Sequence, residues 1–157
     1  MAASVDSESL DQLRDNLERH PRMHGYYLLN FVPLPVDWQG DEEASLTKAF
    51  EALDDQTWKP PELRPKDQLW MDYEVDEARA RAHAVEALVG GGAVGHTRDT
   101  VSERDSSTIW KRFRDLFSLE ARFFIGLGLG DPAYTFQHGA IVVDNQKAGC
   151  LCVIEGD

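Results

Sequence analysis

Hydrophobic residues recur along the chain at helical spacing in four segments. Each segment carries leucine, phenylalanine, tryptophan or alanine on one face and mostly polar or charged residues on the other. The four segments span 7–20, 41–54, 76–89 and 106–119. In the first of them, Leu10, Leu13 and Leu17 share a face and Pro21 ends the helix.

Five other segments have the composition or the alternation of β-strands. They span 25–32, 69–76, 122–129, 134–143 and 150–155. The first is a run of aromatic and branched residues closed by Pro33, which predicts a mostly buried strand in the centre of a sheet. The last two flank a polar segment that ends in glycine, which predicts a C-terminal β-hairpin.

The order of these elements predicts an α+β fold. Strands are concentrated late in the chain, which argues against a doubly wound parallel sheet. We expect a mixed, mainly antiparallel sheet of about five strands, with helices on one face and the hairpin at its C-terminal end. The length of 157 residues fits a single domain over residues 1–157.

Two connecting segments are too irregular for helix or central strand. The segment 55–66 contains Trp58 and three prolines, and it is expected to form either an apolar flap over the core or a binding loop. The segment 90–107 is polar and rich in glycine, which predicts a mobile loop. Its glycines follow a helix instead of preceding one, so the pattern does not indicate a phosphate-binding loop.

Composition narrows the classes of partner. Hydrophobic residues make up 42% of the chain, enough for one sizeable core, and the net charge is −12. Such a charge disfavours binding to nucleic acid and to anionic membrane surfaces. The first residues lack the basic and apolar parts of a signal peptide, and no apolar run is long enough to cross a bilayer, so a cytoplasmic location is expected.

Residues that could carry chemistry are few. Cys150 and Cys152 point to the same face of a strand, where a disulfide between them would distort the backbone, so both are expected to be reduced thiols. His20 and His24 have the spacing of a metal-binding pair on a helix, but Pro21 lies between them. The sequence therefore predicts no metal, no cofactor and no catalytic residue.

His138 carries the alternative interpretation. It lies in the C-terminal hairpin among aromatic residues, a carboxylate and a thiol, which are Tyr134, Phe136, Asp144 and Cys150. The strand before the hairpin, 122–129, has one face that is nearly bare because of its glycines, which would leave room for a ligand. The alternative is thus a small enzyme or ligand-binding protein with a pocket over the C-terminal sheet near His138.

The distribution of acidic residues carries the leading interpretation. Residues 1–66 have a net charge of −6 and residues 67–106 of −5, whereas residues 107–157 have only −1. On the outer face of the predicted strand 69–76, an aromatic residue stands beside a row of carboxylates, namely Trp70, Asp72, Glu74 and Asp76. A second acidic run, Asp41, Glu42 and Glu43, starts a helix, where such residues also stabilise the helix dipole.

An exposed tryptophan surrounded by carboxylates is typical of a site for a protein partner. The simpler explanation is a solvated sheet face with Trp70 covered by the loop 55–66. The first explanation gives the main hypothesis, a small acidic binding protein that acts as an immunity- or antitoxin-type inhibitor of a basic, toxin-like protein. Such an inhibitor needs no catalytic residues, so the sequence favours a binding protein over an enzyme.

Overall fold

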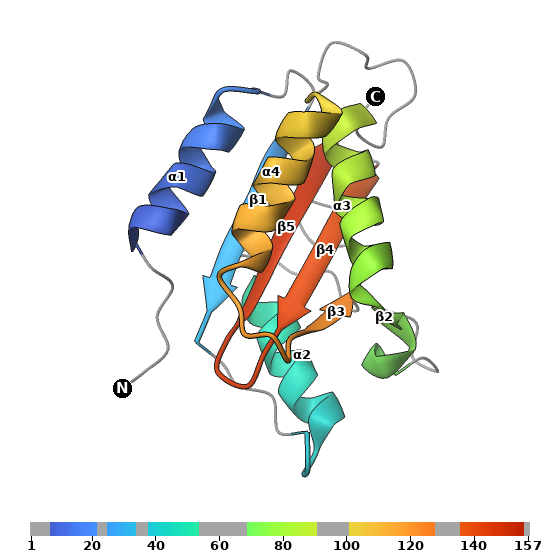
Figure 1. Ribbon diagram of the computed structural model, residues 1–157. Coiled ribbons are helices and arrows are strands. Elements are labelled where there is room, and N and C mark those ends of the chain that lie inside the picture. The colour runs from blue at the N-terminus through green and yellow to red at the C-terminus, as the bar shows by residue number, and fades with distance from the viewer. Residues whose placement is uncertain are drawn as a thin grey trace.

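The computed structural model describes residues 7–21, 25–33, 38–53, 69–90, 101–127 and 136–155. The described elements include four α-helices and five strands, and the chain's last two described elements are long strands (Figure 1). In chain order they are α1 (Ser7–Glu18), β1 (Gly25–Val32), α2 (Glu42–Leu53), the 3-10 helix η1 (Trp70–Tyr73), β2 (Glu74–Val75), α3 (Glu77–Gly90), α4 (Glu103–Arg114), β3 (Arg122–Phe124), β4 (Phe136–Val143) and β5 (Ala148–Glu155). The predicted segment 55–66 lies outside the described residues.

The strands form one open sheet in the order β1-β5-β4-β3-β2, and neighbouring strands are antiparallel. The α+β class, the five strands and the C-terminal hairpin are therefore confirmed. The expected central position of β1 is wrong, because β5 pairs with it on one side only and β1 is the first strand of the order. β5 instead lies between two partners and is buried along its whole length, as its apolar sequence on both faces allows.

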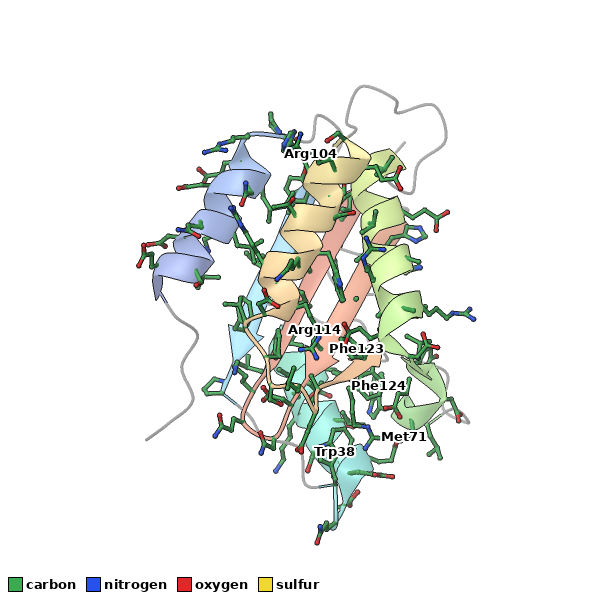
Figure 2. The ribbon with its side chains drawn as sticks, viewed as in Figure 1. Trp38, Met71, Arg104, Arg114, Phe123 and Phe124 are labelled. Atoms are coloured by element: carbon green, nitrogen blue, oxygen red, sulfur yellow. The ribbon has the colours of Figure 1, made fainter. Side chains whose placement is uncertain are left out.

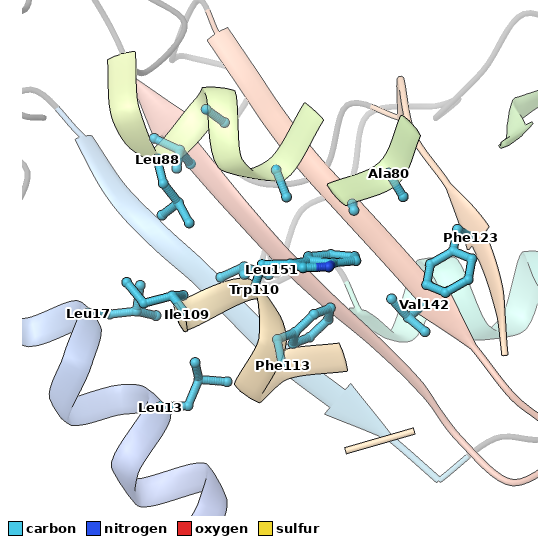
Figure 3. Packing of buried hydrophobic residues seen from close by; sticks show 14 of the residues in the cluster. Leu13, Leu17, Ala80, Leu88, Ile109, Trp110, Phe113, Phe123, Val142 and Leu151 are labelled. Carbon is cyan, nitrogen blue, oxygen red and sulfur yellow. The ribbon is translucent and has the colours of Figure 1, made fainter. Parts of the chain in front are cut away.

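Alternate residues of the long strands enter two separate hydrophobic clusters, one on each face of the sheet. Leu151 and Val153 of β5 join the cluster beneath α1, α3 and α4, which is drawn in Figure 3. Cys150 and Cys152 join the cluster on the opposite face, where α2 packs. Helices thus cover both faces, and α2 is the element that departs from the expected one-sided arrangement (Figure 1).

The packing of α2 follows from its own sequence. Its apolar stripe consists of Leu46, Ala49, Phe50 and Leu53, all of them buried. Phe50 contacts the ring of Phe124 at 5.3 Å between centroids. The apolar stripe of α2 has to be buried, and α1, α3 and α4 already cover one face of the sheet. α2 therefore packs on the opposite face and completes the core there.

Glycine allows β4 and β5 to approach closely at one point. A Cβ atom at Gly139 would lie only 2.2 Å from the backbone oxygen of Leu151. Residue 139 therefore has to be glycine in this register, in which it pairs with Cys152.

The segment 69–76 does not form the expected strand. Residues Trp70–Tyr73 form η1, and only Glu74 and Val75 pair with β3. The carboxylate of Asp72 accepts a hydrogen bond from the backbone N–H of Leu69 at 3.1 Å, a local bond that competes with an extended backbone. Polar and apolar residues do alternate in this segment, but the turn forms where the alternation predicted a strand.

Part of the predicted mobile loop 90–107 belongs to regular structure, because Gly90 ends α3 and Glu103 begins α4. Val101 is buried and its backbone N–H donates to the carbonyl oxygen of Leu88 at 3.1 Å. The hydroxyl of Ser102 then accepts a hydrogen bond from the N–H of Asp105 and begins α4. The prediction is therefore wrong for residues 101–107, and residues 91–100 lie outside the described part of the chain.

The turn between β4 and β5 is organised around a buried carboxylate. Asp144 is only 3% exposed and accepts hydrogen bonds from the backbone N–H groups of Ser118, Gln146 and Lys147. The ammonium of Lys147, itself buried, lies 3.4 Å from the same carboxylate. Burial alone would raise the pKa of Asp144, but the three N–H bonds and the Lys147 charge outweigh it and the pKa is lowered.

No helix within the described residues is long and apolar enough to cross a membrane.

Candidate functional site

The two acidic runs of the sequence meet in the folded chain. The carboxylate of Glu43, in the first turn of α2, accepts hydrogen bonds from the backbone N–H groups of Trp70 at 2.8 Å and Met71 at 3.2 Å. Figure 2 shows Trp38 and Met71 at the same end of the molecule. We call this region the acidic end and define it by Asp41, Glu42, Glu43, Asp72, Glu74, Asp76 and Glu77. The structure therefore brings Glu43 of the first acidic run to the backbone of the second, and Glu42 lies near Arg122, the partner of Glu74.

Trp70 does not have the position that the sequence suggested. Its side chain is only 4% exposed and packs edge-on against Phe50 with 5.0 Å between ring centroids. The indole N–H donates to the hydroxyl of Thr47 at 2.6 Å, which satisfies its polar atom inside the core. The prediction of an exposed Trp70 is wrong, because η1 turns this residue inward toward α2.

Several carboxylates of the acidic end begin helices. Asp41 accepts a hydrogen bond from the N–H of Ala44 at 3.0 Å, and Asp76 accepts one from the N–H of Arg79 at 2.8 Å. These bonds satisfy N–H groups that have no partner inside the first turn of a helix. Asp41 and Asp76 remain exposed to solvent while they do so. Their structural role leaves their charge available at the surface.

Two arginines balance part of this charge. The guanidinium of Arg122 makes two hydrogen bonds of 2.7 Å to the carboxylate of Glu74, and these bonds raise the pKa of Arg122. The same guanidinium lies 4.0 Å from the centre of the Trp38 ring. Arg114 donates to Glu77 at 3.0 Å. The carboxylates of the acidic end outnumber these two cations, so the region keeps a negative field.

An exposed apolar side chain stands in this field. Leu69 is 54% exposed, and the next residue but one, Met71, is half-buried. Trp38 is also half-buried beneath Arg122. Sequence reasoning placed Leu69 on the inner face of a strand and did not consider Trp38. The signal that could have identified Leu69 is the Asp72 side chain, which is well spaced to cap a turn at that residue.

His138 lies across from a second histidine. Its ring and that of His83 on α3 are 5.7 Å apart between centroids, with an interplanar angle of 44°. Both side chains are partly exposed. Burial, followed by the nearby His138, lowers the pKa of His83, while Glu86 acts in the opposite direction. No pattern in the sequence predicted that these two residues would lie together.

A groove of about 440 Å³ lies between α1 and β1. Its walls are mostly apolar, and Arg14 and Glu18 of α1 add charge. Within the described part of the chain the groove is therefore far along the sheet from β3, over which the alternative interpretation expected a pocket. His138 does not line it.

The two cysteines are free and buried, as the sequence predicted. Both belong to the cluster beneath α2, and the thiol of Cys150 lies 4.0 Å from the carbonyl oxygen of Leu28. Their surroundings are apolar side chains of the core, which is the environment of structural cysteines.

Comparisons with protein-family models, with curated proteins and with solved structures find no match to this chain.

Proposed function

We propose that this protein is a binding protein whose acidic end engages a basic protein, as an immunity- or antitoxin-type inhibitor of a cationic toxin would. The observation that carries the proposal is the contact between two acidic segments, 41–43 and 72–77, beside the exposed residue Leu69, whose backbone N–H donates to Asp72. These segments are separated in sequence, and Glu43 joins them by hydrogen bonds to the backbone of η1.

The chemistry of the acidic end fits a basic partner. Unbalanced carboxylates attract lysine and arginine side chains over a distance of about one Debye length, which speeds the encounter of the two proteins. Leu69 and the half-buried Met71 add apolar area that a partner would remove from water. In this proposal Leu69 takes the anchoring role that the sequence suggested for Trp70.

The carboxylates are also held in place before any partner arrives. Asp41, Asp72 and Asp76 each accept a backbone hydrogen bond, and Glu74 is fixed by Arg122. A surface whose side chains are already ordered loses less entropy when it binds. This preorganisation favours a binding role over a merely solvated surface.

Site-specific crosslinking tests the proposal directly. A photoreactive amino acid in place of Leu69 is expected to capture a basic protein in extracts of the native source. The same amino acid in place of Gln12, an exposed residue of α1, is the matched control and should not capture that protein. Absence of a basic protein specific to position 69 would overturn the proposal, and a small molecule retained by the purified chain would favour the alternative ligand-binding function.

Variants with the captured protein should separate the two parts of the surface. Leu69→Ala is expected to speed dissociation about tenfold, since burial of a leucine contributes roughly 1.5–3 kcal/mol. Glu42→Lys is expected to slow association about three- to tenfold at low salt, with the difference vanishing at high salt. Stopped-flow or surface plasmon resonance measurements give both rates.

Each variant has a counterpart elsewhere on the molecule. Leu119 is 95% exposed and provides the control Leu119→Ala, and Glu103 in the first turn of α4 provides Glu103→Lys, with the same loss of helix-dipole stabilisation as in α2. Equal effects of Glu42→Lys and Glu103→Lys would show that only the total charge matters and that the acidic end is not the site.

A further inference from the structure

We propose that His83 and His138 bind a divalent transition-metal ion that joins α3 to β4. The two rings come from elements far apart in the sequence and lie 5.7 Å apart between their centres, at an interplanar angle of 44°. Two imidazoles bound to one Zn²⁺, each at about 2.1 Å from the metal and at a tetrahedral angle, have ring centres roughly 5–6 Å apart. The observed separation of 5.7 Å lies within this range.

The fold holds this separation through the close packing of α3 on the sheet. The face of α3 that contacts β4 is made of small side chains, since Ala80, Ala84 and Ala87 are all buried. Alanine lets a helix approach a strand closely, which brings the longer side chain of His83 to the level of His138. The pair is positioned by two rigid elements rather than by a loop.

The surroundings of the pair are open enough for an ion to enter. Both histidines are partly exposed. Glu86, in the turn of α3 after His83, places a negative charge near the ring, and Arg79, in the turn before it, places a positive one. These two charges are opposite in sign, and the ion would be held by the two nitrogen ligands.

The ligand set defines the class of metal. Imidazole nitrogen suits Zn²⁺, Ni²⁺ and Cu²⁺, whereas Mg²⁺ and Ca²⁺ prefer oxygen ligands. Among the described residues no group of three or more histidine, cysteine, aspartate or glutamate side chains is placed to hold an ion. Within the described residues the ion would therefore be held by the two imidazole ligands, and it would exchange readily.

Calorimetric titration of the full chain with Ni²⁺ tests the site. One ion per chain is expected to bind, and His83→Gln and His138→Gln should each weaken binding at least tenfold. His20→Gln is the matched control, because His20 is also partly exposed and lies 3.8 Å from a carboxylate, that of Asp105. Mg²⁺ should not compete.

Thermal unfolding gives a readout that separates misfolding from loss of the site. Without metal the variants should melt close to the parent, and with Ni²⁺ only the parent and His20→Gln should melt at a higher temperature. If a variant fails to fold, Cu²⁺ added to the parent must broaden the imidazole NMR signals of His83 and His138 before those of other histidines. Unchanged binding in both variants, equal weakening in His20→Gln, or broadening that begins elsewhere would overturn the proposal.

Discussion

Replacing Asp144 by alanine should lower the free energy of unfolding by about 3–5 kcal/mol, the cost of leaving a buried charge without its partner. The substitution would strand the ammonium of Lys147, which is only 7% exposed, and three backbone N–H groups that point at the carboxylate. Urea unfolding monitored by tryptophan fluorescence measures the loss. The turn also supports β5, which is buried along its whole length, so the effect should reach the whole sheet.

Asn145→Ala is the control for this change, because Asn145 lies in the same turn and is exposed. It should alter the free energy of unfolding by no more than about 0.5 kcal/mol. Asp144→Asn keeps the shape of the side chain and should fall between the two. A loss below 1 kcal/mol in Asp144→Ala would show that the turn relaxes and that Lys147 reaches water.

The lowered pKa of Asp144 fixes the direction of its pH dependence. The folded protein protonates this carboxyl at a lower pH than the unfolded chain, whose pKa is the ordinary value of 3.8. Its stabilising contribution is therefore complete above that value and is lost as the pH falls through the lower, folded-state pKa. In acid the stability of the parent should approach that of Asp144→Asn.

Trp70→Ala is expected to cost about 3–5 kcal/mol of stability, as for other large side chains removed from a core. The ring fills the space between η1 and α2, where it contacts Phe50 and Tyr73. The change also removes the hydrogen bond that the indole N–H donates to the hydroxyl of Thr47. A thermal melt well below that of the parent would confirm this role.

The neighbouring residue provides the contrast. Leu69→Ala removes a side chain that is half in solvent and should change the stability by less than about 1 kcal/mol. If Trp70→Ala melts with the parent, then the tryptophan is not part of the core and the original hypothesis of an aromatic anchor returns. A Trp70→Phe variant should recover most of the lost packing but not the hydrogen bond to Thr47.

Elements in which apolar residues recur at one regular spacing along the buried face were predicted well from the sequence. The stripe of α2 is an example, because burial of one helix face against any flat layer demands the same spacing. The face of the sheet that α2 covers could not be predicted, since both faces of β5 are equally apolar. Likewise, β1 has the composition of a central strand. It is nevertheless the first strand of the described sheet, because its neighbour β5 pairs with β4 on the other side.

The acidic residues of the candidate site were named from the sequence, but their arrangement was not. Alternation over 69–76 indicated a strand, but bonds from Asp72 to Leu69 and from Glu43 to the backbone of η1 stabilise a turn instead. The second of these bonds connects segments separated by a long stretch of chain, so no local pattern could reveal it. The pairing of His83 with His138 could not be predicted from the sequence for the same reason.

The position of β5 in the sheet has a consequence for the order in which the protein can assemble during synthesis. Gly25 pairs with Glu155 and Val32 with Ala148, so β1 emerges from the ribosome long before its only described partner strand exists. Long-range pairing of this kind slows folding and leaves apolar strands exposed in the meantime. The aromatic and branched side chains of β1 must then be shielded by the nascent helix α1 or by a chaperone. Aggregation of growing chains should accordingly depend on Tyr27, Leu29 and Phe31 more than on any residue of the hairpin.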